Sequence, residues 1–174
     1  MTRTLAYFQN FMDPVALDIL ADAPGITTQR IAFDADADEN WAQLAQVHGA
    51  QFLPTNETPE AWYPTRSFLE RCPNLLAVSA TGAGYDMMDV EACNDLGIMV
   101  VNNSGANSVS VAQHVLGLAL TLSKQIAQTD KAIRANAKIS RLDYIGSELT
   151  GKTVGIIGLG NIGRLVAGYV KIFG

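Results

Sequence analysis

The sequence has few of the features that mark secreted, nucleic-acid-binding or membrane proteins. Its 174 residues include two cysteines, Cys72 and Cys93, too few for a disulfide scaffold, and we expect both to be reduced thiols in a cytoplasmic protein. Charged residues make up only 17% of the chain, and 12 Lys and Arg against 17 Asp and Glu give a net charge of −5. Without a basic run, this balance argues against nucleic acid or an anionic membrane as partner. The longest apolar run, residues 115–122, is far too short to span a bilayer.

What the sequence does contain is a regular alternation of short strands and helices. Hydrophobic residues make up 48% of the chain, enough for a sizeable core. Apolar runs predict strands at residues 4–8, 26–33, 51–53, 75–79 and 98–101. Between them, amphipathic patterns predict helices at residues 13–23, 41–47, 62–71 and 89–96, with an acidic loop at 34–39. Such alternation is typical of βα units with a parallel sheet, so we predict a flavodoxin-like α/β domain.

A glycine-rich turn near the end of the chain is the most informative motif. The run TVGIIGLGNIG, residues 153–163, predicts a buried strand that enters a turn and opens a helix. In this context Gly158 permits the tight turn, Gly160 lets the backbone approach a pyrophosphate, and Gly163 lets the helix pack close to the strand. The amides of Asn161 and Ile162 would then face the phosphates. The alternative is a βα turn that binds no ligand.

The domain boundary is expected between these two patterns. Residues 102–108 are rich in Asn, Ser and Gly and suit a hinge. We therefore assign residues 1–104 to the flavodoxin-like domain and residues 105–174 to the first part of a Rossmann dinucleotide-binding domain. Apolar side chains occupy almost every face of a helix expected at 109–126, so it should be buried on more than one side. A polar connection, residues 129–147, should be helical through about residue 138.

Two segments carry a resemblance to a known family. The first is SATGAGYDMMD at residues 79–89, which leads to GIMVVNNSGAN at 97–107. The second is SVAQH at 110–114, which leads to ELTGKTVG at 148–155 and the glycine turn. In this order and spacing they resemble the D-isomer-specific 2-hydroxyacid dehydrogenase family, which includes formate and phosphoglycerate dehydrogenases. The resemblance rests on motifs over residues 70–174 and only on the strand–helix pattern over residues 1–69.

The resemblance implies roles for individual residues. By position, the backbone amides of Ala83 and Gly84 would hold a substrate carboxylate, although a simple β-turn is the alternative. Asn107 would either donate to the substrate or cap the following helix, and Val111 would either face the nicotinamide or be an ordinary core residue. The family's catalytic histidine comes much later in the chain. We therefore expect His114 to be an interior histidine and not an acid–base residue.

The family's catalytic groups do not fall within these residues. Hydride transfer to a 2-oxo acid needs a cation over the carbonyl and a general acid–base beside it. The family supplies an arginine and a histidine–glutamate pair, all beyond the glycine turn. We expect no catalytic residue and no metal site here, so the stretch alone should be inactive.

The resemblance implies the N-terminal part of an oxidoreductase that uses NAD or NADP on a small 2-hydroxy or 2-oxo acid, as a homodimer through residues 109–147. A non-catalytic, corepressor-like relative and a structural fragment remain alternatives.

Overall fold

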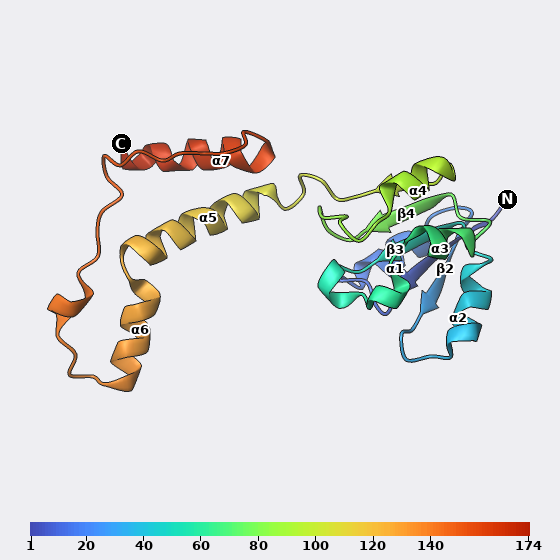
Figure 1. Cartoon of the computed structure of the whole chain (residues 1–174), viewed down its shortest axis with the longest axis horizontal. Coiled ribbons are helices and arrows are strands. Elements are labelled where there is room, and N and C mark those ends of the chain that lie inside the picture. Colours follow the sequence, from blue (N-terminus) through green and yellow to red (C-terminus); the bar gives the residue numbers. More distant parts are fainter. The chain divides into compact units, whose positions relative to one another are not determined.

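The computed structural model describes all 174 residues. They form two compact units, Met1–Ser104 and Gly105–Gly174 (Figure 1).

Five parallel strands form the sheet of the first unit. They are β1 (Arg3–Phe8), β2 (Ile26–Ile31), β3 (Gly49–Phe52), β4 (Ala77–Ala80) and β5 (Met99–Val101). Their order across the sheet is β2-β1-β3-β4-β5, and every neighbouring pair is parallel. This is the order of doubly wound flavodoxin-like sheets, so the predicted fold of this unit is confirmed.

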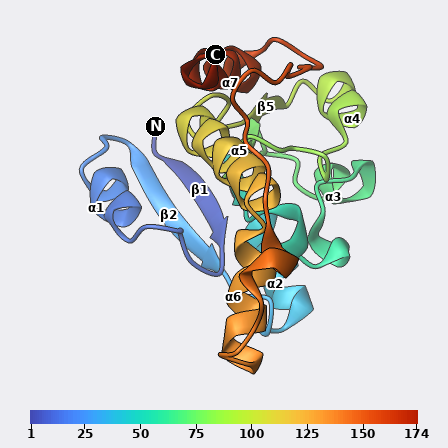
Figure 2. The same cartoon turned by 90° about the vertical axis from the view of Figure 1, so that its left-hand side faces the viewer.

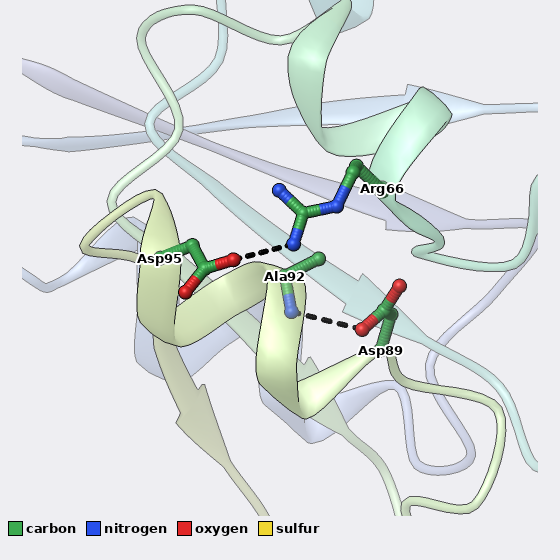
Figure 3. A network of polar contacts seen from close by, with 4 residues as sticks. All are labelled: Arg66, Asp89, Ala92 and Asp95. Carbon is green, nitrogen blue, oxygen red and sulfur yellow. Dashed lines mark hydrogen bonds and ion pairs between the residues drawn. The ribbon is translucent and has the colours of Figure 1, made fainter.

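The helices of the first unit connect these strands. They are α1 (Val15–Ala21), α2 (Ala37–Leu44), α3 (Arg66–Glu70) and α4 (Val90–Asp95), with 3₁₀ turns η1 (Thr55–Glu57) and η2 (Glu60–Trp62). Helix α1 packs against β2 (Figure 2). Asp89 caps α4 by accepting a hydrogen bond from the Ala92 amide, and an ion pair between Arg66 and Asp95 joins α3 to α4 (Figure 3).

Two predicted boundaries in this unit are wrong. The expected acidic loop at 34–39 contains the first turn of α2, because Asp36 caps that helix by accepting from the Asp38 and Glu39 amides at 2.9 and 3.0 Å. The helix expected at 62–71 is interrupted, since Pro64 disfavours a helical backbone at Tyr63, which is extended at φ −63° and ψ 138°.

The core of the first unit lies on one face of the sheet. Alternate strand residues point into it, as the pleat requires; they are Ala6, Phe8, Ala50, Phe52, Val78 and Ala80. Phe52 stacks on Phe8 with ring centroids 4.8 Å apart and meets the edge of Phe68 at 5.5 Å. Because these rings come from β1, β3 and α3, the cluster holds the sheet and its helices together.

The second unit consists mainly of helices. They are α5 (Ser108–Ser123), α6 (Ile126–Ala135) and α7 (Asn161–Val170), with 3₁₀ turns η3 (Arg141–Tyr144) and η4 (Lys171–Phe173). Helix α5 packs against both α6 and α7. In neither unit does a helix combine the length and apolar character that crossing a membrane requires.

The burial predicted for the second unit is not found. Helix α5 buries only Ser108 and Ala112, while Leu118 and Leu122 are 49% and 69% exposed. Residues 153–157, predicted to be a buried strand, form no ladder, and Ile157 is fully exposed. The common reason is that these residues offer no neighbouring strand for residues 153–157 to pair with, and so no sheet to cover the helix.

Candidate functional site

The glycine turn before α7 has the backbone conformation that its sequence predicts. Gly158 has φ +91°, in the left-handed region that favours glycine. A side chain at Gly163 would collide with the carbonyl oxygen of Gly158, so the helix and the turn approach more closely than any other residue would allow. At Gly160, by contrast, an added Cβ would meet no atom of the chain within 4 Å. Two of the glycines are therefore needed by the turn itself, whereas Gly160 leaves open space beside the backbone.

The start of α7 offers unpaired backbone donors. The first amide bonded back to the turn is that of Arg164, which donates to Gly160 O at 3.1 Å. The preceding amides, of Asn161, Ile162 and Gly163, donate to no acceptor within the second unit. Three free N–H groups at the positive end of a ten-residue helix favour an anion, and phosphate is the usual one.

Two residues that the sequence did not single out also shape this turn. The Arg164 side chain folds back, and its Nε donates to the Leu159 carbonyl oxygen at 3.0 Å. Gly105, at φ +90°, lies where a Cβ would come within 3.2 Å of Asn161 Nδ2. No pattern in the sequence signals either contact, because both depend on how the chain folds around the turn.

A hollow of about 350 Å³ lies behind the turn, between residues 154–158, α5 and α7. Its lining includes Val115, Ile156, Ile162 and Val166, which are apolar. The lining fits packing against further apolar groups better than it fits a phosphate.

In the first unit, Ala83 and Gly84 lie in a loop that follows β4. We call residues 82–86, where the resemblance would place the substrate carboxylate, the substrate loop. Neither the Ala83 amide nor the Gly84 amide donates a hydrogen bond within this unit, and Gly84 is exposed. Two adjacent free N–H groups can converge on one carboxylate, so the loop can do the chemistry that the resemblance assigns to it.

The predicted residues of the second unit occupy the start of α5. Asn107 stands at the N-cap position, but its side chain makes no capping hydrogen bond and is exposed. Val111, one turn later, donates its amide to Asn107 O at 3.0 Å and is half-buried. His114 is exposed, so the expected interior histidine is wrong for this chain, since no element covers that part of α5.

Neither cysteine has the surroundings of a nucleophile. Both thiols are free and buried. Burial raises the pKa of Cys72 from 9.0 to about 11 and also raises the pKa of Cys93. Because the thiolate is the reactive form, both side chains are structural.

Comparison with known proteins shows the family. The family model described as "D-isomer specific 2-hydroxyacid dehydrogenase, catalytic domain" matches residues 7–157. D-3-phosphoglycerate dehydrogenase from Mycobacterium leprae is 43% identical over 106 residues, which is 61% of this chain and 20% of that protein.

Two solved structures show the same fold over the whole chain. The 2-hydroxyacid dehydrogenase from Ketogulonicigenium vulgare matches 99% of this chain and 52% of its own length, with 25% identity and a TM-score of 0.75. NAD-dependent formate dehydrogenase from Staphylococcus aureus, solved in complex with NAD, matches 99% of this chain and 54% of its own, with 25% identity and a TM-score of 0.77.

The match to the curated relative is thus confined to a fifth of its length, and the chain spans about half the length of the solved ones. The family match and the agreement in fold confirm the resemblance carried by residues 79–107 and 110–163. The chain belongs to the D-isomer-specific 2-hydroxyacid dehydrogenase family.

Proposed function

We propose that this chain is the N-terminal part of an NAD(P)-dependent oxidoreductase that transfers hydride between a nicotinamide cofactor and a small 2-hydroxy or 2-oxo acid. The observation that carries the proposal is the glycine turn. Gly158 and Gly163 are required by the turn itself, while Gly160 leaves the backbone accessible beside three free amides. This combination fits a pyrophosphate.

The residues present fit a dinucleotide. The open backbone at Gly160 and the amides of Asn161, Ile162 and Gly163 would hold the pyrophosphate, and Val111 would lie against the nicotinamide. When bound, the nicotinamide would supply or accept the hydride. The formate dehydrogenase with the same fold was solved with NAD, which supports a nicotinamide cofactor here.

The substrate carboxylate would be held from the first unit, by the free amides of Ala83 and Gly84. The resemblance assigns Asn107, in the second unit, a further hydrogen bond to the substrate, through the side chain that makes no cap. We place the proton-transferring pair and the cation over the carbonyl outside residues 1–174, so this chain binds and orients both reactants but does not complete the reaction.

We also propose a homodimer through residues 109–147. Its support is the apolar surface of α5, where Val115, Leu118 and Leu122 follow the i, i+3, i+7 spacing of one helix face and are exposed in the single chain. Such a patch on a folded protein typically marks an interface.

The test of the function is a pair of glycine substitutions in the complete gene product. Gly160→Val fills the open space at the turn, and Gly168→Val is the matched control, since a Cβ at Gly168 in α7 also meets nothing. Wild type and control should oxidise NADH or NADPH with pyruvate, glyoxylate, hydroxypyruvate or phenylpyruvate, whereas Gly160→Val should lose cofactor binding in calorimetry.

Unchanged cofactor affinity in Gly160→Val would show that the turn is not the dinucleotide site. A folded wild-type protein that binds cofactor but reduces no 2-oxo acid would favour a non-catalytic relative.

A further inference from the structure

Two hydrogen bonds hold the substrate loop from the segment that follows β5. The backbone N–H of Asn103 donates to the Gly82 carbonyl oxygen at 2.9 Å. The side chain of Asn102 donates through Nδ2 to the Ala83 carbonyl oxygen at 2.8 Å. Both acceptors lie immediately before the amides assigned to the substrate carboxylate.

The geometry of the peptide bond turns these contacts into an orienting device. The Gly82 carbonyl and the Ala83 N–H belong to one peptide unit, and the Ala83 carbonyl and the Gly84 N–H belong to the next. The chain has no cis peptide bond, so in each planar unit the C=O and the N–H point in opposite directions. Bonding both carbonyls to residues 102–103 therefore turns both N–H groups away from that segment. It also polarises the two peptide units, which makes the N–H groups better donors.

The remainder of the loop is anchored independently. Before it, Thr81 donates to the Phe52 carbonyl oxygen through both its amide and its hydroxyl, at 3.1 and 2.6 Å. After it, Met87 and Met88 are buried in the core. With both ends fixed, the orientation of the two central peptide units is what the contacts from residues 102–103 decide.

We infer that Asn102 is a positioning residue for substrate binding: its side-chain amide holds the Ala83–Gly84 peptide so that the Gly84 N–H faces the substrate carboxylate. The inference rests on the proposed function of the substrate loop. Two neighbouring asparagines hold the loop in different ways. Asn103 acts through its backbone, which no side-chain substitution removes, and its own side chain is exposed with no hydrogen bond. Asn102 acts through its side chain, which is half-buried.

This difference supplies a matched experiment in the complete gene product. Asn102→Ala removes the donor, and Asn102→Asp replaces it with an oxygen that repels the Ala83 carbonyl at nearly the same size. Both should raise the KM for the 2-oxo acid by about 5- to 20-fold, the loss expected for weakening one of two hydrogen bonds to a charged group. The KM for NADH or NADPH should not change. Asn103→Ala, which keeps its backbone donor, should behave as wild type.

A second measurement does not depend on how the variants fold. In amide NMR spectra of the wild-type protein, titration with oxamate, a non-reducible isostere of pyruvate, should shift the Ala83 and Gly84 amide signals and leave the Asn103 side-chain signals in place.

The outcomes separate this inference from the proposed function. An active wild type with an unchanged 2-oxo acid KM in Asn102→Ala would overturn the role of Asn102 and leave the function standing. An equal rise in KM for Asn103→Ala would also overturn it, since the effect would then be general loosening of the loop. A wild type that reduces no 2-oxo acid and shows no oxamate shift at Gly84 would overturn both.

Discussion

The two units of the chain resemble each other in apolar content and differ in how much of it they bury. In Met1–Ser104, five strands pair through backbone hydrogen bonds and form a sheet. Aromatic rings and aliphatic side chains pack on one face of this sheet. In Gly105–Gly174, the only buried hydrophobic residues are Ala112 and Val166, although α5 is among the most apolar segments of the chain. An apolar helix therefore predicts that another element will pack against it. The sequence of the helix alone does not show whether that element is present.

The largest expected difference is between the truncation of a buried side chain in the first unit and the truncation of an apolar side chain in the second. Phe52→Ala removes a fully buried ring between Phe8 and Phe68 and should lower the free energy of unfolding of the first unit by about 3–5 kcal/mol. Leu118→Ala removes a side chain that is 49% exposed, and should cost less than about 0.5 kcal/mol in the monomer. Urea denaturation of the two variants at low protein concentration measures both values.

The same pair tests the proposed homodimer. If Leu118→Ala costs as much as a core truncation, and the cost grows with protein concentration, then α5 is covered by another molecule in solution. Sedimentation of wild type and Leu118→Ala at matched concentrations would show that association directly. A monomer with cooperative unfolding of residues 105–174 would contradict both the proposed interface and the contrast between the units.

A smaller effect should appear at alkaline pH, where the cysteine contribution is confined to the first unit, which contains both cysteines. Burial raises the pKa of Cys72 from 9.0 to about 11, so between these values the unfolded thiol ionises while the folded one stays protonated. The unfolded state then binds fewer protons, and stability must fall as pH rises. The contribution of Cys72 to this fall should be about 2 kcal/mol, from the size of the pKa shift.

Other groups titrate over the same range, so the effect of Cys72 is isolated by comparing the change in stability with pH between two proteins. Unfolding free energies of wild type and Cys72→Ala are compared at pH 8 and pH 10.5, which cancels the packing lost in the variant at both pH values. An equal loss of stability in the two proteins would mean that the thiol ionises freely in the folded state.

The sequence predicted the fold of the first unit better than that of the second. The strands β1 to β5 were predicted within a few residues because each of them finds a parallel neighbour in this chain, and the βα alternation predicted the parallel sheet. The end of α3 was predicted, but its start was not, because Pro64 acts on the residue before it. The strand at 153–157 was predicted from β-branched residues alone, and such a pattern cannot say whether a partner strand is present.

The candidate site also contains some features that the sequence predicts and others that it does not. Glycine positions are readable because the turn imposes a φ above zero at Gly158 and a close approach at Gly163. The roles of Ala83 and Gly84 came from the resemblance, since backbone donors leave no mark on side-chain identity. The contacts of Asn102 and Arg164 could not be predicted, because each depends on which carbonyl group the fold brings near the side chain.

The smallest expected effect compares the caps of one helix in each unit. Asp89 accepts a hydrogen bond from the Ala92 amide at 2.8 Å at the start of α4, so Asp89→Ala should cost about 1 kcal/mol of stability. Asn107 occupies the same position before α5 but makes no capping hydrogen bond, so Asn107→Ala should leave stability within about 0.5 kcal/mol of wild type.

The pair decides between the two predicted roles of Asn107. If its side chain serves the substrate, Asn107→Ala in the complete gene product should raise the KM for the 2-oxo acid while the melting temperature stays unchanged. If it serves the helix, the melting temperature should fall as it does for Asp89→Ala, with no separate effect on the KM.

Asp95→Asn is the control for charge removal near α4, because the Arg66–Asp95 ion pair is half-exposed and should contribute at most about 1 kcal/mol. A large loss from Asp95→Asn would show that the charge on α4, and not the cap at Asp89, stabilises that helix.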